Sequence, residues 1–243
     1  MNSPFEFCLR LGDSDLILSQ RLGAWCGHGP ALEEDLALTN VALDLLGQAR
    51  LWLTLAGERE GGGRDEDQFA YLRDAGEFRN LLLTEQPNGD YAHTMARQFF
   101  FDAWHLPLLE TLAASSDAAV AAIAAKAACE AAYHLRRSRD LIVRLGDGTA
   151  ESHQRVQAAV AALWPYTGEM FAADEVDRSV VDLEALRPRW QQEVETTFAR
   201  ATLAVPADNW SQTGGKQGIH SEKLGTLLAE MQFLQRAYPG AQW

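Results

Sequence analysis

The sequence has few cysteines, no long apolar run and no excess of positive charge, and each absence excludes a class of protein. Its three cysteines, Cys8, Cys26 and Cys129, form no pairwise motif, which predicts reduced thiols in a cytoplasmic protein. Charged residues interrupt the longest apolar stretches, so no membrane span is expected. The N-terminus shows no basic region followed by an apolar core, so no secretory signal is predicted there. A net charge of −13 at pH 7 disfavours nucleic acid and anionic membranes as partners.

A helical hydrophobic period dominates the 243 residues, and the alternation typical of strands is nearly absent. The composition, 47% apolar and 23% charged residues, is that of a soluble globular protein. The length fits one domain of ordinary size. We therefore predict a single all-α domain over residues 1–243.

Cap and stop signals divide this pattern into separate helices. Asp13 or Ser14 is expected to cap the first helix, Asp90 the third, and Ser116 or Asp117 the fourth. Several predicted helices approach or exceed about twenty residues, which favours a four-helix bundle core with additional helices. The predicted helices cover approximately residues 13–26, 32–60, 90–114, 117–145, 152–171, 188–203 and 222–238.

Glycines mark the expected irregular segments. Gly61-Gly62-Gly63 begins one that extends to about Gly89. Gly214-Gly215-Lys216 is superficially similar to a phosphate loop, but it lacks the full spacing and follows no predicted strand. These glycines are therefore expected to provide backbone freedom in a surface loop.

Two carboxylate–histidine pairs lie on predicted helices, Asp102-x-x-His105 and Glu130-x-x-x-His134. A di-iron site in a four-helix bundle requires a Glu from each of two helices and a Glu-x-x-His from each of the other two. No Glu-x-x-His occurs in this sequence. The pattern indicates a metal-enzyme scaffold without the complete ligand set.

Each candidate also has a purely structural interpretation. Asp102 and His105 can form a buried hydrogen-bonded pair beside Trp104, and Glu130 can pair with one of the arginines that follow it. A second candidate group shares one helix face at i, i+4 and i+8 spacing and would line a hydrated cavity or form a polar network between packed helices. That group consists of Asn40, Asp44 and Gln48.

Several sequence blocks distributed along the chain carry a family resemblance. They are similar to the C subunits of the bacterial ring-1,2-phenylacetyl-CoA epoxidase, a multicomponent oxygenase of phenylacetate breakdown. The blocks are residues 11–13, 18–23, 25–28, 43–50, 85–89, 102–105, 213–216, 228–232 and 234–236.

The resemblance implies a ferritin-like fold and a function within a hetero-oligomer. It implies a partner, the related A subunit, which carries the di-iron centre. The complex would epoxidise the aromatic ring of phenylacetyl-CoA with O₂, and its electrons would come from NADPH through a reductase subunit that holds FAD and an iron–sulfur centre. The C subunit would be structural, without a cofactor or catalytic residues of its own.

Compared with the A-subunit pattern, this chain has lost most of the ligand residues. The resemblance places Gln20 where the first helix would provide Glu, and Leu45 and Gln48 where the second would provide Glu-x-x-His. The third helix keeps a carboxylate, and the fourth keeps only the histidine of its pair. The vestigial metal-centre positions are thus Gln20, Leu45, Gln48, Asp102, Ala131 and His134.

An alternative prediction is that the chain is an enzyme in its own right. It would be a di-metal carboxylate oxidase with an unusual ligand set. The ligands would come from Asp44, Asp102, Glu130, His105 and His134.

Overall fold

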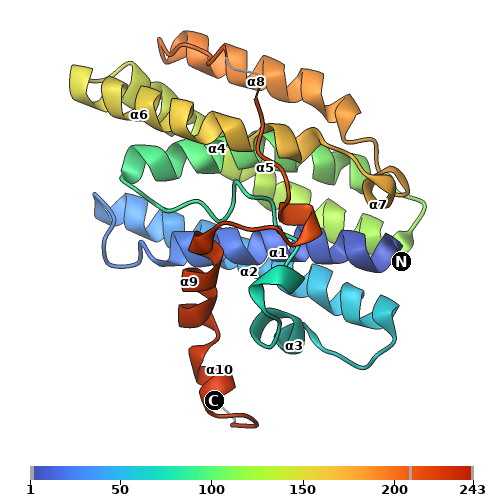
Figure 1. Ribbon diagram of the computed structural model, residues 1–243. Helices are drawn as coiled ribbons and strands as arrows, with labels where there is room; N and C mark the ends of the chain where they lie inside the picture. The colour runs from blue at the N-terminus through green and yellow to red at the C-terminus, as the bar shows by residue number, and fades with distance from the viewer. Residues whose placement is uncertain (1–2, 208–209, 242–243) are drawn as a thin grey trace. The chain divides into compact units, whose positions relative to one another are not determined.

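The computed structural model describes residues 3–207 and 210–241, and every regular element within them is helical (Figure 1). The all-α prediction is confirmed. The α-helices are α1 (Ser3–Gly23), α2 (Leu32–Glu60), α3 (Glu66–Tyr71), α4 (Tyr91–Leu112), α5 (Ala118–Gly146), α6 (Ala150–Leu163), α7 (Glu175–Arg178), α8 (Arg187–Arg200), α9 (Glu222–Met231) and α10 (Phe233–Ala237).

The chain divides into two compact units. One comprises Met1–Gln86 together with Gly214–Trp243, and the other comprises Pro87–Thr213. Each unit contains one pair of long helices, α1 with α2 in the first and α4 with α5 in the second. The expectation of one domain over residues 1–243 stays a prediction.

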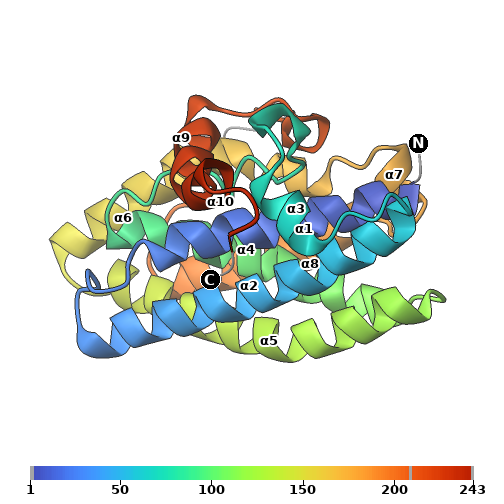
Figure 2. The same cartoon turned by 90° about the horizontal axis from the view of Figure 1, so that it is seen from below.

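In the first unit, α1 and α2 form an antiparallel pair, and Figure 2 shows α2 along its length. The pair is close because Gly12 has no side chain: a Cβ there would lie 2.8 Å from Leu53 Cδ2. The prediction that α1 starts at Asp13 or Ser14 was wrong, because α1 begins ten residues earlier, at Ser3. Both residues are buried inside the helix, where Ser14 Oγ donates to the Arg10 carbonyl at 2.7 Å.

Asp13 is buried inside α1 because it has a cationic partner far away in the sequence. Arg73 Nη1 donates to Asp13 Oδ2 at 3.0 Å, and Arg73 Nη2 donates to the other carboxylate oxygen. The backbone N–H of Arg79 also donates to Asp13 Oδ2, at 2.8 Å. The segment after α3 is thereby fixed to the middle of α1.

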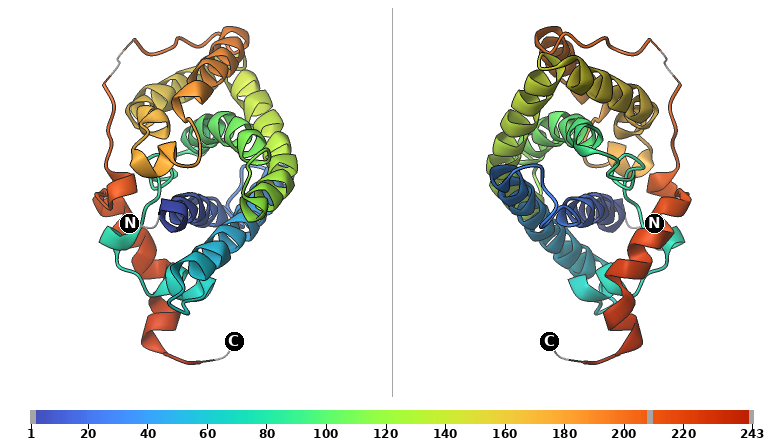
Figure 3. Two further views of the ribbon diagram at one scale, coloured as in Figure 1. Left: turned by 90° about the vertical axis from the view of Figure 1, so that its right-hand side faces the viewer. Right: turned by 90° about the vertical axis from the view of Figure 1, so that its left-hand side faces the viewer.

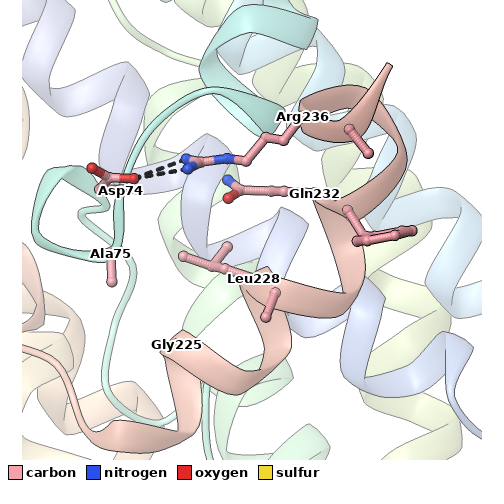
Figure 4. Close-up of a pocket in the computed structure, with 9 residues that line it drawn as sticks. Asp74, Ala75, Gly225, Leu228, Gln232 and Arg236 are labelled. Atoms are coloured by element: carbon pink, nitrogen blue, oxygen red, sulfur yellow. Dashed lines mark hydrogen bonds and ion pairs between the residues drawn. The ribbon is translucent and has the colours of Figure 1, made fainter. Parts of the chain in front are cut away.

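The C-terminal segment of the first unit contacts the same region. The predicted final helix is divided in two: α9 ends at Met231, α10 begins at Phe233, and the intervening Gln232 is buried. Its Nε2 donates to the carbonyls of Ala70 and Arg73, each at 3.0 Å. A pocket of about 530 Å³ lies between α9–α10 and the turn at Ala75–Glu77, beside the ion pair of Arg236 and Asp74 (Figure 4).

The surface-loop prediction for Gly214 and Gly215 was wrong, because both residues and Lys216 are buried. A Cβ on Gly215 would lie 2.2 Å from the carbonyl oxygen of Asn80. Only glycine allows the two backbone segments to approach this closely. The glycines thus serve packing within the first unit.

In the second unit, α4 is buried around most of its circumference, and it packs against α5, α6 and α8. Figure 3 shows these helices end-on around α4. Its aromatic residues build much of the core: the Phe100 ring lies 5.8 Å from Trp164 and 5.9 Å from Trp190. A helix that is apolar on all sides is expected to be enclosed in this way.

Local cap signals predict some helix ends in this unit correctly and miss others. Asp90 accepts from the N–H of His93 at 2.9 Å, and Asp117 caps α5, as expected. The predicted 152–171 helix begins earlier, after the cap Thr149, and ends at Leu163 because proline follows at position 165. The short helix α7 was not predicted.

Among the described residues, no helix combines the length and apolar character needed to cross a membrane.

Candidate functional site

Asp102 is the centre of a buried polar cluster in the second unit. Its side chain lies on α4, where only 1% of the residue is exposed. Gln98 Nε2, one turn earlier on α4, donates to Asp102 Oδ1 at 2.7 Å, and Ser138 Oγ on α5 donates to Oδ2 at 2.7 Å. Burial raises the pKa of Asp102 to about 6, although the electrostatic influence of His134 and these hydrogen bonds oppose the shift.

His105 is buried one turn beyond Asp102 on the same helix. Its ring centroid lies 4.7 Å from that of Phe101 and 6.1 Å from that of Trp104, with which it stacks. Burial, with a smaller contribution from His134, lowers the pKa of His105 to about 3. His105 is therefore a neutral aromatic side chain of the core at physiological pH.

The α5 positions of the candidate site differ in burial. His134 and Ala131 are buried, each 1% exposed, whereas Glu130 is half-buried. The influence of His134 on the pKa values of both Asp102 and His105 places these three residues in one electrostatic neighbourhood. The structure therefore groups Asp102, His105 and His134, and the hydrogen bonds of Asp102 go to Gln98 and Ser138.

The remaining vestigial positions belong to the first unit. Leu45 and Gln48 on α2 are buried, and Gln20 on α1 is half-buried. Asn40 is exposed, Asp44 half-buried and Gln48 buried. The progression arises because each step of four residues turns an α-helix about 40° past a full circle. The three residues of that candidate group therefore run from the surface into the core.

The donor set does not fit a di-iron centre. Leu45 and Ala131 offer no ligand atom, and both oxygens of Asp102 already accept hydrogen bonds. In the part of the chain that the structure describes, no three side chains of His, Cys, Asp or Glu are grouped so that they could hold a metal ion. Iron in such sites needs several anionic oxygens.

Sequence reasoning missed a second buried polar cluster, in the first unit. Glu85 is fully buried, and its Oε2 lies 2.8 Å from His220 Nδ1 and 3.1 Å from Asn80 Nδ2. Its Oε1 accepts from the N–H of Ser221 at 2.7 Å. His220 Nε2 lies 3.0 Å from the carbonyl oxygen of Phe78. Because both ring nitrogens face acceptors, the protonated imidazolium satisfies both contacts.

The Glu85–His220 pair makes stability depend on pH. Burial lowers the pKa of His220, but the hydrogen bonds to Glu85 and Phe78 outweigh it and leave the pKa raised. The folded chain therefore binds this proton more tightly than the unfolded chain, whose histidine titrates near 6.5. This contribution to the free energy of unfolding is complete below about pH 6.5 and is lost as pH rises through the raised value.

We expect His220→Gln to lose about 1–3 kcal/mol of unfolding free energy at pH 6 and to abolish this decline toward alkaline pH. Urea unfolding of wild type and variant from pH 6 to pH 9 measures both effects. His28→Gln is the matched control, because His28 is exposed and contacts the Cys26 carbonyl two residues away. A wild-type stability that rises steadily over this range relative to His220→Gln would contradict the assignment.

Comparison with known proteins identifies the family. A model of the family described as phenylacetic acid catabolic protein matches residues 1–243. The C subunit of 1,2-phenylacetyl-CoA epoxidase from Escherichia coli (strain K12) is 54% identical over 249 residues, covering 100% of this chain and 100% of that protein. The chain belongs to the phenylacetic acid catabolic protein family.

Membership in the phenylacetic acid catabolic protein family confirms the resemblance found in the sequence. This family has a ferritin-like helical fold, in agreement with the long helices of both units. The relative is named as one subunit of an epoxidase, which implies a multi-subunit enzyme of phenylacetate catabolism.

Proposed function

We propose that this chain is a non-catalytic structural subunit of 1,2-phenylacetyl-CoA epoxidase. It would hold a related di-iron subunit in its active assembly, and that subunit would epoxidise the aromatic ring with O₂. Electrons would come from NADPH through the reductase with FAD and an iron–sulfur centre. The observation that carries this proposal is the 54% identity to a C subunit over the whole of both chains.

The buried residues support the structural role. Asp102 accepts hydrogen bonds from Gln98 and Ser138, so both of its carboxylate oxygens have partners within the core. His105 has a pKa of about 3 and packs among aromatic rings. A partner that binds only the folded chain stabilises that chain by mass action. The folded chain stabilises the partner in the same way. The proposed location is the cytoplasm, because the sequence carries only three cysteines and they form no pairwise motif.

The alternative, a di-metal oxidase formed by this chain alone, has weaker support. Of its proposed ligands, Asp44 and Glu130 are half-buried, and His105 is enclosed by Phe101 and Trp104. Metal binding would have to displace the hydrogen bonds that Asp102 accepts from Gln98 and Ser138.

Activity and metal content separate these two functions. We expect the purified chain to contain no stoichiometric iron after iron loading, and to produce no epoxide from phenylacetyl-CoA with the reductase and NADPH. Addition of the di-iron subunit should give a stable complex that turns over. Elemental analysis, size-exclusion chromatography and product analysis provide the measurements, with the di-iron subunit alone as control. Two irons per chain with turnover in the absence of the other subunit would reject the proposal.

A further inference from the structure

One face of α2 exposes a row of leucines. Leu32, Leu36, Leu43 and Leu46 are exposed by 71%, 56%, 59% and 39%, respectively. On a helix with 3.6 residues per turn these four positions fall within an arc of about 80°. Single exposed leucines are ordinary on protein surfaces, but an aligned group marks a site of interaction. We call this group the leucine row.

A groove in the first unit begins at the leucine row. It has a volume of about 540 Å³ and lies between α2 and α3, with Leu16 of α1 also in its wall. Leu43 and Leu46 of the row form one side, and Tyr71 of α3 lies in the lining as well. The row and the groove are thus continuous, and they could accept apolar side chains that project from a helix.

Acidic residues border this apolar surface. Glu33 and Asp44 lie along one edge of the leucine row and Asp35 along the other, as their helical positions require. Glu66 and Asp67 line the groove, and Arg50, the cation in its lining, is paired with Glu66 at 3.0 Å. A complementary partner therefore has an apolar centre and a basic rim.

The same charges argue against a second copy of this chain as the partner. Pairing two leucine rows face to face would bring the acidic borders together. The net charge of −13 on each copy would add a long-range repulsion. A different chain with basic residues around an apolar helix face fits this surface better.

We propose that the leucine row and its groove are the docking surface for the catalytic subunit of the epoxidase, through an apolar helix face bordered by Lys or Arg. This inference rests on the proposed function, which requires that partner. The leucines would provide the dehydrated centre of the interface, and the carboxylates at its rim would accelerate association.

The decisive variant is Leu36→Glu/Leu43→Glu, which places two carboxylates in the centre of the row. Binding to the purified catalytic subunit is expected to weaken by at least about a hundredfold, because a buried interface cannot solvate these charges. Ile219→Glu is the matched control. Its side chain is 69% exposed in the loop before α9 of the same unit, outside the leucine row and its groove, and it should bind as wild type does. Thermal unfolding of each isolated variant checks that folding is intact.

Two further measurements keep the test independent of how the variant folds. In the wild-type complex, backbone amides of residues 32–50 should gain protection from hydrogen exchange. Glu33→Gln/Asp44→Asn should reduce the salt dependence of the association rate. Unchanged exchange over residues 32–50 in a formed complex would overturn the inference, whatever the variants do.

The remaining outcomes distinguish failure of the surface from failure of the function. If wild type does not bind the catalytic subunit at all, the proposed function fails. If wild type binds and Leu36→Glu/Leu43→Glu binds equally well, the function stands and the docking surface is wrong. If sedimentation shows that the variant converts a self-associating chain to a monomer, a second copy occupies the row and the inference is likewise overturned.

Discussion

Arg73→Met is expected to destabilise the chain by about 3–5 kcal/mol, because it leaves a buried carboxylate without its charged partner. Both side chains of the Arg73–Asp13 pair are almost fully buried, 3% and 0% exposed. After the substitution, Asp13 would keep the Arg79 N–H as a donor. The carbonyls of Phe69 and Glu77 would also lose the hydrogen bonds that Arg73 donates.

A double-mutant cycle separates the pair from its surroundings. Asp13→Leu/Arg73→Met removes both charges, so it should lose less stability than the sum of the single changes. Arg155→Met is the control for loss of surface ion pairs, and Arg155 also bonds Asp90 at 3.1 Å. Arg155 bonds Glu151 at 2.7 Å with both side chains more than half exposed, and such pairs contribute less than about 1 kcal/mol.

Urea unfolding at pH 7 measures the four chains of the cycle and the Arg155→Met control. An Arg73→Met loss as small as that of Arg155→Met would show that water reaches Asp13 in solution. Strict additivity in the cycle would show that the two side chains do not interact.

The helices α1 and α2 show where sequence reasoning succeeds and where it fails for the fold. The predicted range of α2 was correct, because its end is signalled locally: Gly61 adopts a left-handed φ of 70°. The start of α1 was missed, because Asp13 and Ser14 look like caps in a local pattern. Their roles depend on residues sixty or more positions away, such as Arg73 and Leu81.

The candidate site was predictable to the same limited extent. The i−4 spacing of Gln98 and Asp102 is visible in the sequence and places both on one helix face. Ser138 is 36 residues from Asp102, and only the packing of α5 on α4 brings it into contact. The Glu85–His220 pair spans 135 residues, so no motif could have indicated it.

Substitutions at Asp102 are expected to show whether its carboxylate is structural or catalytic. The first expected effect is on the pH dependence of stability. Its pKa of about 6 exceeds the usual value, so the folded chain binds this proton more tightly than the unfolded chain does. Its contribution to stability therefore falls as pH rises from about 4 to 6. His105, with a pKa of about 3, has the opposite effect over this range. The difference between the unfolding free energies of wild type and Asp102→Asn, followed over pH, isolates the contribution of Asp102.

Asp102→Asn should retain the local hydrogen bonds. The amide oxygen can accept from Gln98, and the amide nitrogen can donate to Ser138, whose hydroxyl also contacts the Leu135 carbonyl at 3.3 Å. Asp102→Ala loses these contacts and leaves a cavity. It should therefore be about 1–3 kcal/mol less stable than Asp102→Asn in urea unfolding at pH 7. Equal stability of the two variants would show that these hydrogen bonds contribute little.

The deciding measurement is kcat per intact complex for Asp102→Ala and His134→Ala. If the chemistry occurs in the di-iron subunit, both variants should lower Tm and weaken assembly while kcat of the assembled fraction stays within about twofold, because neither residue contacts the reacting atoms. A metal ligand would behave in the opposite way, since its loss removes a group that acts only in the reaction. A thousandfold fall in kcat in well-assembled Asp102→Ala complex, with iron content reduced in step, would refute the structural role and support the oxidase.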